Sequence, residues 1–145
     1  MTDTRESAVQ ITNYLFFDGQ CAEAFRFYAQ TLGGKLERLL TAGESPAGAS
    51  MPAEARNRIM NAYLSFGDQA LMGSDWMAER PYEPPQGFYV SLSLEAEGEA
   101  RRIFKTLAEG GAVRMPIEKT FFAACFGMLV DRFGIPWMII GRRTP

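Results

Sequence analysis

The stretch that decides the fold is YLFFDGQCAEAFRFYAQTLGG, residues 14–34, which begins as an apolar strand and continues as a helix. A stretch of the same design, YVSLSLEAEGEARRIFKTLAEGG, returns at residues 89–111. Each predicted helix carries a Glu-Ala pair near its start and stops at two consecutive glycines, which tolerate the left-handed backbone of a helix C-cap. A design that recurs in the same order along a chain indicates two copies of one structural unit.

Each unit is predicted to consist of a strand, a helix and three further strands. In the first unit these elements are expected at residues 9–17, 21–32, 35–41, 59–66 and 69–74. In the second unit they are expected at residues 89–94, 97–108, 112–117, 124–130 and 136–140. The helices are predicted from apolar positions at helical spacing, and the strands from short apolar runs bounded by turn residues.

One such unit has a single helix and one sheet face, which is too little to enclose a core. We therefore expect a single α+β domain over residues 1–145, in which two βαβββ modules in tandem form a curved mixed sheet around a cavity, with the helices outside. The modules are placed at residues 9–74 and 88–141. Residues 75–87 join them, and their RPYEPPQG segment has three prolines, which favours a semi-rigid linker.

Residues 42–58 are rich in glycine, alanine, serine and proline, and they are predicted to be a long mobile loop. Two interpretations remain open for this loop: a flexible lid over the cavity, or an insert without a role in binding.

The composition is that of an ordinary globular protein, with 47% hydrophobic and 22% charged residues. A net charge of −2 and the absence of a lysine or arginine cluster argue against a nucleic-acid partner. The N-terminus lacks the basic and then apolar pattern of a signal peptide, and no apolar run approaches the ~18 residues that span a membrane. We expect a cytoplasmic protein without a membrane partner.

The chain contains no histidine, which excludes Ser-His-Asp triads, Cys-His pairs and histidine metal sites. Its two cysteines, Cys21 and Cys125, are not in a Cys-x-x-Cys motif. A helix start can favour a thiolate at Cys21, but a nucleophilic cysteine normally needs a basic partner. Both cysteines are predicted to be reduced and structural.

Several motifs together resemble the PhnB-like branch of the vicinal oxygen chelate superfamily, which has the glyoxalase and bleomycin-resistance fold. These motifs cover nearly the whole chain. They are YLFFDG at 14–19, EAFRFY at 23–28, LGG at 32–34, EPPQGFYVSL at 83–92 and FGMLVDRFGIPWMII at 126–140. Some relatives are labelled as 3-demethylubiquinone methyltransferase-like. The sequence has no strand followed by a glycine-rich turn of the kind that cradles a nucleotide cofactor.

In metal-using members of the superfamily, each module supplies one ligand from its first strand and one from its last. The resemblance places these positions at Asn13, Leu71, Tyr89 and Met138. The family pattern has histidine or glutamate there, whereas leucine has no donor atom and a thioether suits only soft metals. We therefore expect no metal and no cofactor.

The same four positions are expected to line a cavity for a small-molecule ligand. Strand alternation adds further candidates to this cavity, namely Asn61, Tyr63, Ser91, Phe126 and Met128. Phe122 is added because Glu118-Lys119 and Phe121-Phe122 lie where a loop could close the cavity. Ordinary core packing is the competing interpretation for the aromatic residues and methionines. Asn13 is the best single candidate, since a buried amide without a partner costs ~1–3 kcal/mol.

Three residues outside this cavity set are assigned other roles. Asp131 is expected to fix the turn at Phe133-Gly134, and Trp137 to pack beneath a helix. Trp76 is expected at a dimer interface or at the mouth of the pocket.

Three functions remain open. The leading one is metal-independent binding of a small apolar or aromatic molecule, as bleomycin-resistance members do by sequestration, and the resemblance implies a homodimer. The alternative is an enzyme of the same fold, of lyase, dioxygenase or transferase type, that uses Tyr63, Tyr89 or Glu118 for proton transfer. The third is a structural or regulatory dimer with a filled interior.

Overall fold

The structure is a computed structural model that describes residues 8–143. The first module contains β1 (Asn13–Phe17), α1 (Cys21–Leu32), β2 (Lys35–Thr41), β3 (Ile59–Phe66) and β4 (Gln69–Asp75). Its strands form a four-stranded sheet in the order β1-β4-β3-β2, in which β1 runs parallel to β4 and the other pairs are antiparallel.

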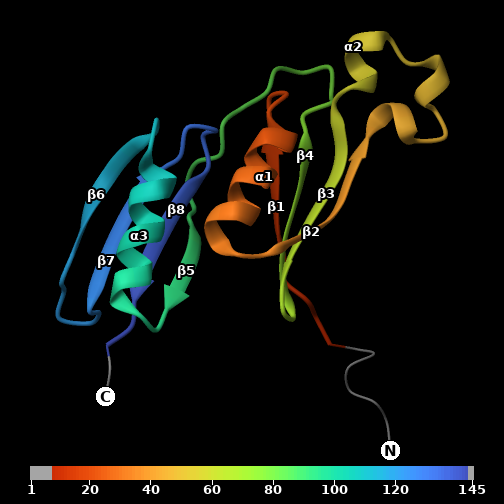
Figure 1. The fold of residues 1–145 in the computed structure, drawn as a ribbon. Coiled ribbons are helices and arrows are strands. Elements are labelled where there is room, and N and C mark those ends of the chain that lie inside the picture. Colours follow the sequence, from red (N-terminus) through yellow and green to blue (C-terminus); the bar gives the residue numbers. More distant parts are fainter. Residues whose placement is uncertain (1–7, 144–145) are drawn as a thin grey trace, which may run out of the picture.

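The second module repeats this arrangement with β5 (Val90–Leu94), α3 (Glu97–Ala108), β6 (Ala112–Glu118), β7 (Cys125–Val130) and β8 (Pro136–Gly141). The sheet order is β5-β8-β7-β6, again with one parallel pair, between β5 and β8. The predicted α+β fold of two βαβββ modules is confirmed, with its strands divided between two four-stranded sheets. Figure 1 shows the sheets side by side, with α1 and α3 on the same side of them.

Element bounds that depend on local pattern agree closely with prediction. Both long helices and β2 and β3 have the predicted bounds. β1 is shorter than predicted, because residues 9–12 lie outside any strand and expose Val9 (87%) and Ile11 (93%). The pairing of β1 with β4 runs only from Leu71 opposite Asn13 to Asp75 opposite Phe17, although β4 itself begins at Gln69.

The segment at residues 42–58 is folded rather than bare loop. It contains two 3-10 turns, Ala42–Glu44 and Gly48–Ser50, and the short helix α2 (Ala53–Arg56). The first turn is stabilised by a capping box between Thr41 and Glu44. Figure 1 shows this segment at the end of the first sheet, beside the top of β3.

The two modules share one hydrophobic core. Trp137, Tyr28, Phe17 and Phe25 are its largest fully buried side chains, and they come from both modules. Phe133 of the second module contacts Phe17 and Tyr28 of the first, with ring centroids 6.4 and 6.2 Å apart. The tandem units therefore bury their apolar faces against each other as well as beneath their own helices.

Each sheet has one face toward its helix and one face away from it, which we call the open face. Gly73 on β4 and Gly127 on β7 identify the helix faces, since an added Cβ would meet the rings of Phe25 on α1 and Phe104 on α3. Strand alternation then assigns every other residue of β4 and β7 to an open face.

Among residues 8–143, no helix is long and apolar enough to cross a membrane.

Candidate functional site

In the second module, four predicted candidates share the open face. The register pairs Ser91 with Met138 and Met138 with Met128, while Phe126 lies two residues before Met128 on β7. Their strand neighbours Leu129 and Ile139 are buried on the helix side. Tyr89 directly precedes β5 and is half-buried. The alternation that was predicted for this module therefore agrees with the register.

Asn61 and Tyr63 lie on the open face of the first module, where Tyr63 is opposite Met72. Both contact Arg38 of β2: its Nη1 donates to the Asn61 Oδ1 at 2.7 Å, and its guanidinium lies 5.7 Å from the Tyr63 ring centroid. Arg38 therefore already occupies the amide oxygen of Asn61 and lies over the ring of Tyr63.

Leu71 and Asn13 do not face the open side, so the predicted orientation is wrong for both. Leu71 is 5% exposed in the core and pairs with Leu64, which is also buried. Asn13 lies opposite Leu71 and two residues before Leu15, so it is on the same, helix-facing side of the sheet. It stands at the exposed start of β1. The reason is that α1 packs against Leu15 and Phe17, which fixes the outward positions of β1 as Tyr14 and Phe16.

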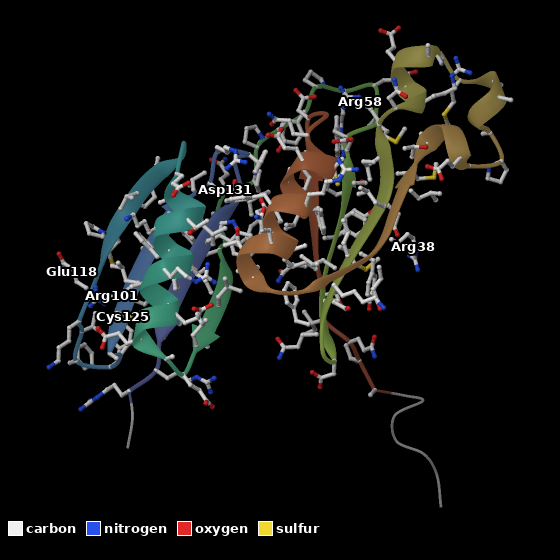
Figure 2. The ribbon with its side chains drawn as sticks, viewed as in Figure 1. Arg38, Arg58, Arg101, Glu118, Cys125 and Asp131 are labelled. Atoms are coloured by element: carbon white, nitrogen blue, oxygen red, sulfur yellow. The ribbon has the colours of Figure 1, made fainter. Side chains whose placement is uncertain are left out.

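Phe122 belongs to an exposed aromatic group at the end of the second sheet. It is 50% exposed, and its ring centroid lies 5.2 Å from that of Phe126 and 5.3 Å from that of Phe121. Glu118 ends β6 opposite Phe126 and is exposed. Figure 2 shows Glu118 far from Arg38, which contacts Tyr63, so Glu118 and Tyr63 are not brought together.

A pocket with a largely apolar and aromatic lining lies elsewhere, at the junction of the two modules. It has a volume of about 390 Å³, and we call it the junction pocket. It is lined by residues of β1, of the linker and of the second module: Tyr14, Leu15, Phe16, Trp76, Arg80, Pro81, Glu83, Pro85, Phe88 and Ile135. None of the ten predicted cavity residues is among them, whereas Trp76 had been assigned to a pocket mouth or a dimer interface.

Aromatic contacts shape this pocket. The rings of Phe16 and Trp76 meet edge to face with centroids 5.4 Å apart, and Tyr14 lies 5.1 Å from Phe16. Tyr14 and Phe16 are each 41% exposed, and Phe88 is 44% exposed. Exposed aromatic rings gathered around a concavity provide a surface on which an apolar ligand can be buried.

The linker wall of the pocket is fixed by backbone contacts. The Trp76 amide donates to the Phe17 carbonyl at 2.7 Å, and the indole Nε1 donates to the Arg80 carbonyl at 2.8 Å. Arg58, shown in Figure 2 near the top of β4, donates to the Trp76 carbonyl at 2.9 Å. The Tyr82 hydroxyl donates to the Phe16 carbonyl at 3.0 Å. The linker is therefore attached to β1 and to Arg58, the residue before β3.

A more polar pocket of about 680 Å³ lies on the other side of this wall. Asp18, Glu54, Arg58 and Tyr82 line it, and it shares Trp76, Arg80 and Pro81 with the junction pocket. Burial, together with the nearby Asp18 carboxylate, raises the pKa of Tyr82 above its usual range, which keeps this hydroxyl a donor to Phe16.

The buried polar residues have structural roles. Asp131 accepts hydrogen bonds from the amides of Phe133 and Ile135, as predicted for a turn-fixing aspartate, and Trp137 is fully buried, as predicted. Cys21 and Cys125 are free and buried. Burial raises the pKa of Cys21, and the neighbouring Asp75 raises it further, so the environment opposes a thiolate.

Similarity to known proteins identifies the family of this chain. The model of the family described as 3-demethylubiquinone-9 3-methyltransferase matches residues 9–140. The chain belongs to this PhnB-like family.

PhnB-like relatives match over almost their full length. Protein YjdN of Escherichia coli strain K12 is 32% identical in an alignment 136 residues long, which covers 89% of this chain and 92% of that protein. The crystal structure of protein PA1353 from Pseudomonas aeruginosa is 47% identical, covers 94% of this chain and 100% of its own, and has a TM-score of 0.86. A PhnB protein from Bacillus cereus, described as a putative 3-demethylubiquinone-9 3-methyltransferase, is 24% identical, covers 91% and 98%, and has a TM-score of 0.72.

The PhnB-like fold extends to glyoxalase-related proteins. A glyoxalase-related enzyme from Fulvimarina pelagi is 15% identical, covers 92% of this chain and 89% of its own, and has a TM-score of 0.58. At this identity the likeness shows the fold alone, a glyoxalase-type fold such as the resemblance to the vicinal oxygen chelate superfamily predicts.

The metal site of that superfamily is not supported by the donor set of this PhnB-like chain. Of the four corresponding positions, Leu71 has no donor atom and lies in the core. Asn13 is on the helix side of its sheet, whereas Tyr63 and Met72 are on the open face. Tyr89 and Met138 do not supply the carboxylate or imidazole groups that hard or borderline divalent cations prefer. Within residues 8–143, no three acidic or cysteine side chains gather closely enough to hold a metal ion. The residues present do not fit a divalent metal.

Proposed function

We propose that this PhnB-like protein binds a small apolar or aromatic molecule in the junction pocket, without a metal ion. The observation that carries the proposal is the aromatic lining of the pocket between the modules. Its volume of about 390 Å³ lies within the range of small-molecule sites, which is roughly 300–1,000 Å³. Such sites are largely apolar with a few polar groups, and here these groups are the side chains of Arg80 and Glu83.

The rings of the pocket suit a flat ligand. Phe16 and Trp76 are nearly perpendicular, with an interplanar angle of 87°, so a flat molecule can stack on one ring and meet the edge of the other. The backbone contacts of Trp76 hold this corner in place, which lowers the ordering cost of binding. The proposal concerns binding, and the label of the family as a methyltransferase is not carried over to the activity of this chain.

The proposal is tested by titration with N-phenyl-1-naphthylamine, an uncharged aromatic probe whose emission rises in apolar sites. Phe88→Ala removes one wall of the pocket, and we expect it to weaken binding about fivefold to thirtyfold, as for the loss of a partly buried aromatic ring. Phe121→Ala is the matched control, because Phe121 is 88% exposed and lies outside the pocket. Equal affinities of the two variants, or no binding by the native protein, contradict the proposal.

We also propose that the protein forms a homodimer through its open faces. Apolar side chains remain exposed on or beside the open face of the second module, namely Met115 (42%), which is opposite Met128, and Phe122 (50%), whose ring contacts Phe126. Exposed apolar surface of this kind marks protein-protein contacts when it is contiguous. Native mass spectrometry at micromolar concentration tests the proposal, and a monomer with unchanged mass at all concentrations contradicts it.

We further propose a cytoplasmic location. The two thiols are free and buried, which suits a reducing compartment. Cell fractionation with an antibody against the protein tests this location, and recovery in an oxidising compartment contradicts it.

A further inference from the structure

One position in the junction pocket already holds a positive charge. The guanidinium carbon of Arg80 lies 5.2 Å from the centroid of the Trp76 ring, a distance at which a cation is attracted to the face of an indole. The indole itself is held by its Nε1–H bond to the Arg80 backbone carbonyl at 2.8 Å. Because that bond uses only the backbone of Arg80, its side chain can move away while Trp76 keeps its place.

The other rings lie around Trp76 and not around the guanidinium. Phe16 meets Trp76 at 5.4 Å, Tyr14 and Phe88 line the junction pocket, and the Tyr82 ring lies 6.5 Å from Trp76 in the second pocket. An indole face that holds a guanidinium can also accept a methylated ammonium group, as it does in ligand-binding proteins that recognise such groups. The face of Trp76 therefore fits an organic cation better than it fits an anion.

The charges near the pocket point the same way. The two pockets that share the Trp76 wall are lined by the carboxylates Asp18, Glu54 and Glu83 and by the guanidiniums Arg58 and Arg80. Asp18 and Arg58 lie 3.5 Å apart and compensate each other. Among residues 8–143, Glu54, Glu83 and Arg80 form no ion pair. If the Arg80 side chain swings into solvent, the remaining local charge is negative.

We propose that the ligand of the junction pocket is a small aromatic molecule with a methylated ammonium group, which replaces the Arg80 guanidinium over Trp76. Arg80 is then an internal competitor that occupies the cation position in the free protein, and Glu83 at the pocket rim attracts the incoming charge. This inference rests on the proposed function and adds the charge of the ligand to it.

The test compares three small molecules of similar shape by isothermal titration calorimetry. They are 3-hydroxyphenyltrimethylammonium, its uncharged isostere 3-tert-butylphenol, and the anion 3-hydroxybenzoate. We expect the cation to bind about threefold to thirtyfold more tightly than the uncharged isostere, which corresponds to one cation–π contact in a partly desolvated site. The anion is expected to bind most weakly.

Two variants separate the roles of the charged residues. Arg80→Met removes the competitor and keeps the chain length, so it should tighten binding of the cation and leave the isostere unchanged. Glu83→Gln should weaken binding of the cation alone. Arg26→Met is the control, because Arg26 is exposed on α1 and lines neither pocket. The Arg80 and Glu83 side chains are exposed, so these variants are expected to fold normally.

Equal affinity for the cation and its isostere, or weaker binding of the cation by Arg80→Met, would overturn the inference. Tight binding of 3-hydroxybenzoate that is lost in Arg80→Met would overturn it as well and would assign an anionic ligand. In each of these cases binding of the isostere still supports the proposed function. If none of the three molecules binds, the pocket does not bind aromatic molecules and both proposals fail.

Discussion

The hydroxyl of Tyr28, on α1 of the first module, donates a hydrogen bond of 2.5 Å to the carboxylate of Asp131, between β7 and β8 of the second. The same Asp131 oxygen accepts from the Trp137 indole at 2.9 Å, and the other oxygen accepts from two backbone amides. Figure 2 shows Asp131 between α1 and α3. Because all these groups are buried, the contact joins the modules through a fully hydrogen-bonded carboxylate.

Tyr28→Phe removes the donor that reaches Asp131 from the other module. We expect the free energy of unfolding to fall by about 1.5–3 kcal/mol, the usual value of a hydrogen bond to a charged group. Urea unfolding measures this change. Tyr63→Phe serves as the control, since Tyr63 is half-buried on the open face, and its loss of a hydroxyl should stay within about 0.5 kcal/mol. Equal effects in the two variants would show that the contact between the modules contributes nothing.

The same hydroxyl predicts a loss of stability at alkaline pH. Burial, reinforced by the Asp131 carboxylate, raises the pKa of Tyr28 well above its ordinary value of 10.0. The unfolded chain then releases this proton first as the pH rises, so the stabilisation from Tyr28 is complete below about pH 10 and is lost progressively above it.

Urea midpoints measured between pH 8 and pH 11.5 test this dependence. Cys21, whose pKa is also raised by burial from 9.0, should begin the decline about one pH unit earlier. Tyr28→Phe should have a flatter profile above pH 10 than the native protein, and Cys21→Ala a flatter profile between pH 9 and pH 10. Parallel profiles for all three proteins contradict the assignment.

Gly73 permits the close approach of α1 to the first sheet. A Cβ at this position would lie 2.7 Å from the Leu15 carbonyl oxygen and 2.7 Å from the Phe25 ring. Gly73→Ala should therefore lower the melting temperature, with a cost of about 1–3 kcal/mol for overpacking. Gly98→Ala is the matched control on α3, where nothing lies within 4 Å, and it should raise the melting temperature slightly. Calorimetry that finds Gly73→Ala neutral would contradict the packing described here.

Trp76 and Trp137 should respond differently to a soluble quencher. Trp137 is fully buried, whereas Trp76 lines both pockets. Acrylamide is expected to quench the emission of Trp76 and to leave most of that of Trp137, and Trp76→Phe should remove the quenchable component. Occupation of the junction pocket by a ligand should protect the same component. Quenching that persists in Trp76→Phe would mean that Trp137 is accessible.

The sequence was sufficient for the elements whose signals are local. The bounds of α1 and α3 were predicted from apolar spacing and from paired glycines. Gly33 has the left-handed φ of 80° at the C-cap of α1, whereas the C-cap of α3 is an extended Glu109 that is followed by Gly110 with a φ of 75°. The repeat predicted two modules because corresponding elements recur in order. The roles of Asp131 and Trp137 were also predicted, since one adjoins a turn and the other lies in an apolar strand. The family motifs agreed with the family that the comparisons show.

The faces of the strands and the site were decided only by the tertiary structure. Residues 14–17 are all apolar, so the pattern could not tell whether Asn13 and Leu15 or Tyr14 and Phe16 lie beneath α1. Packing against Phe25 placed Leu15 beneath α1, and Leu71 lies in the same core. The junction pocket arises because the linker folds back onto β1, where Tyr82 bonds to the Phe16 carbonyl across 66 residues. A contact between residues so distant leaves no periodic signal, because it depends on how two finished modules pack together.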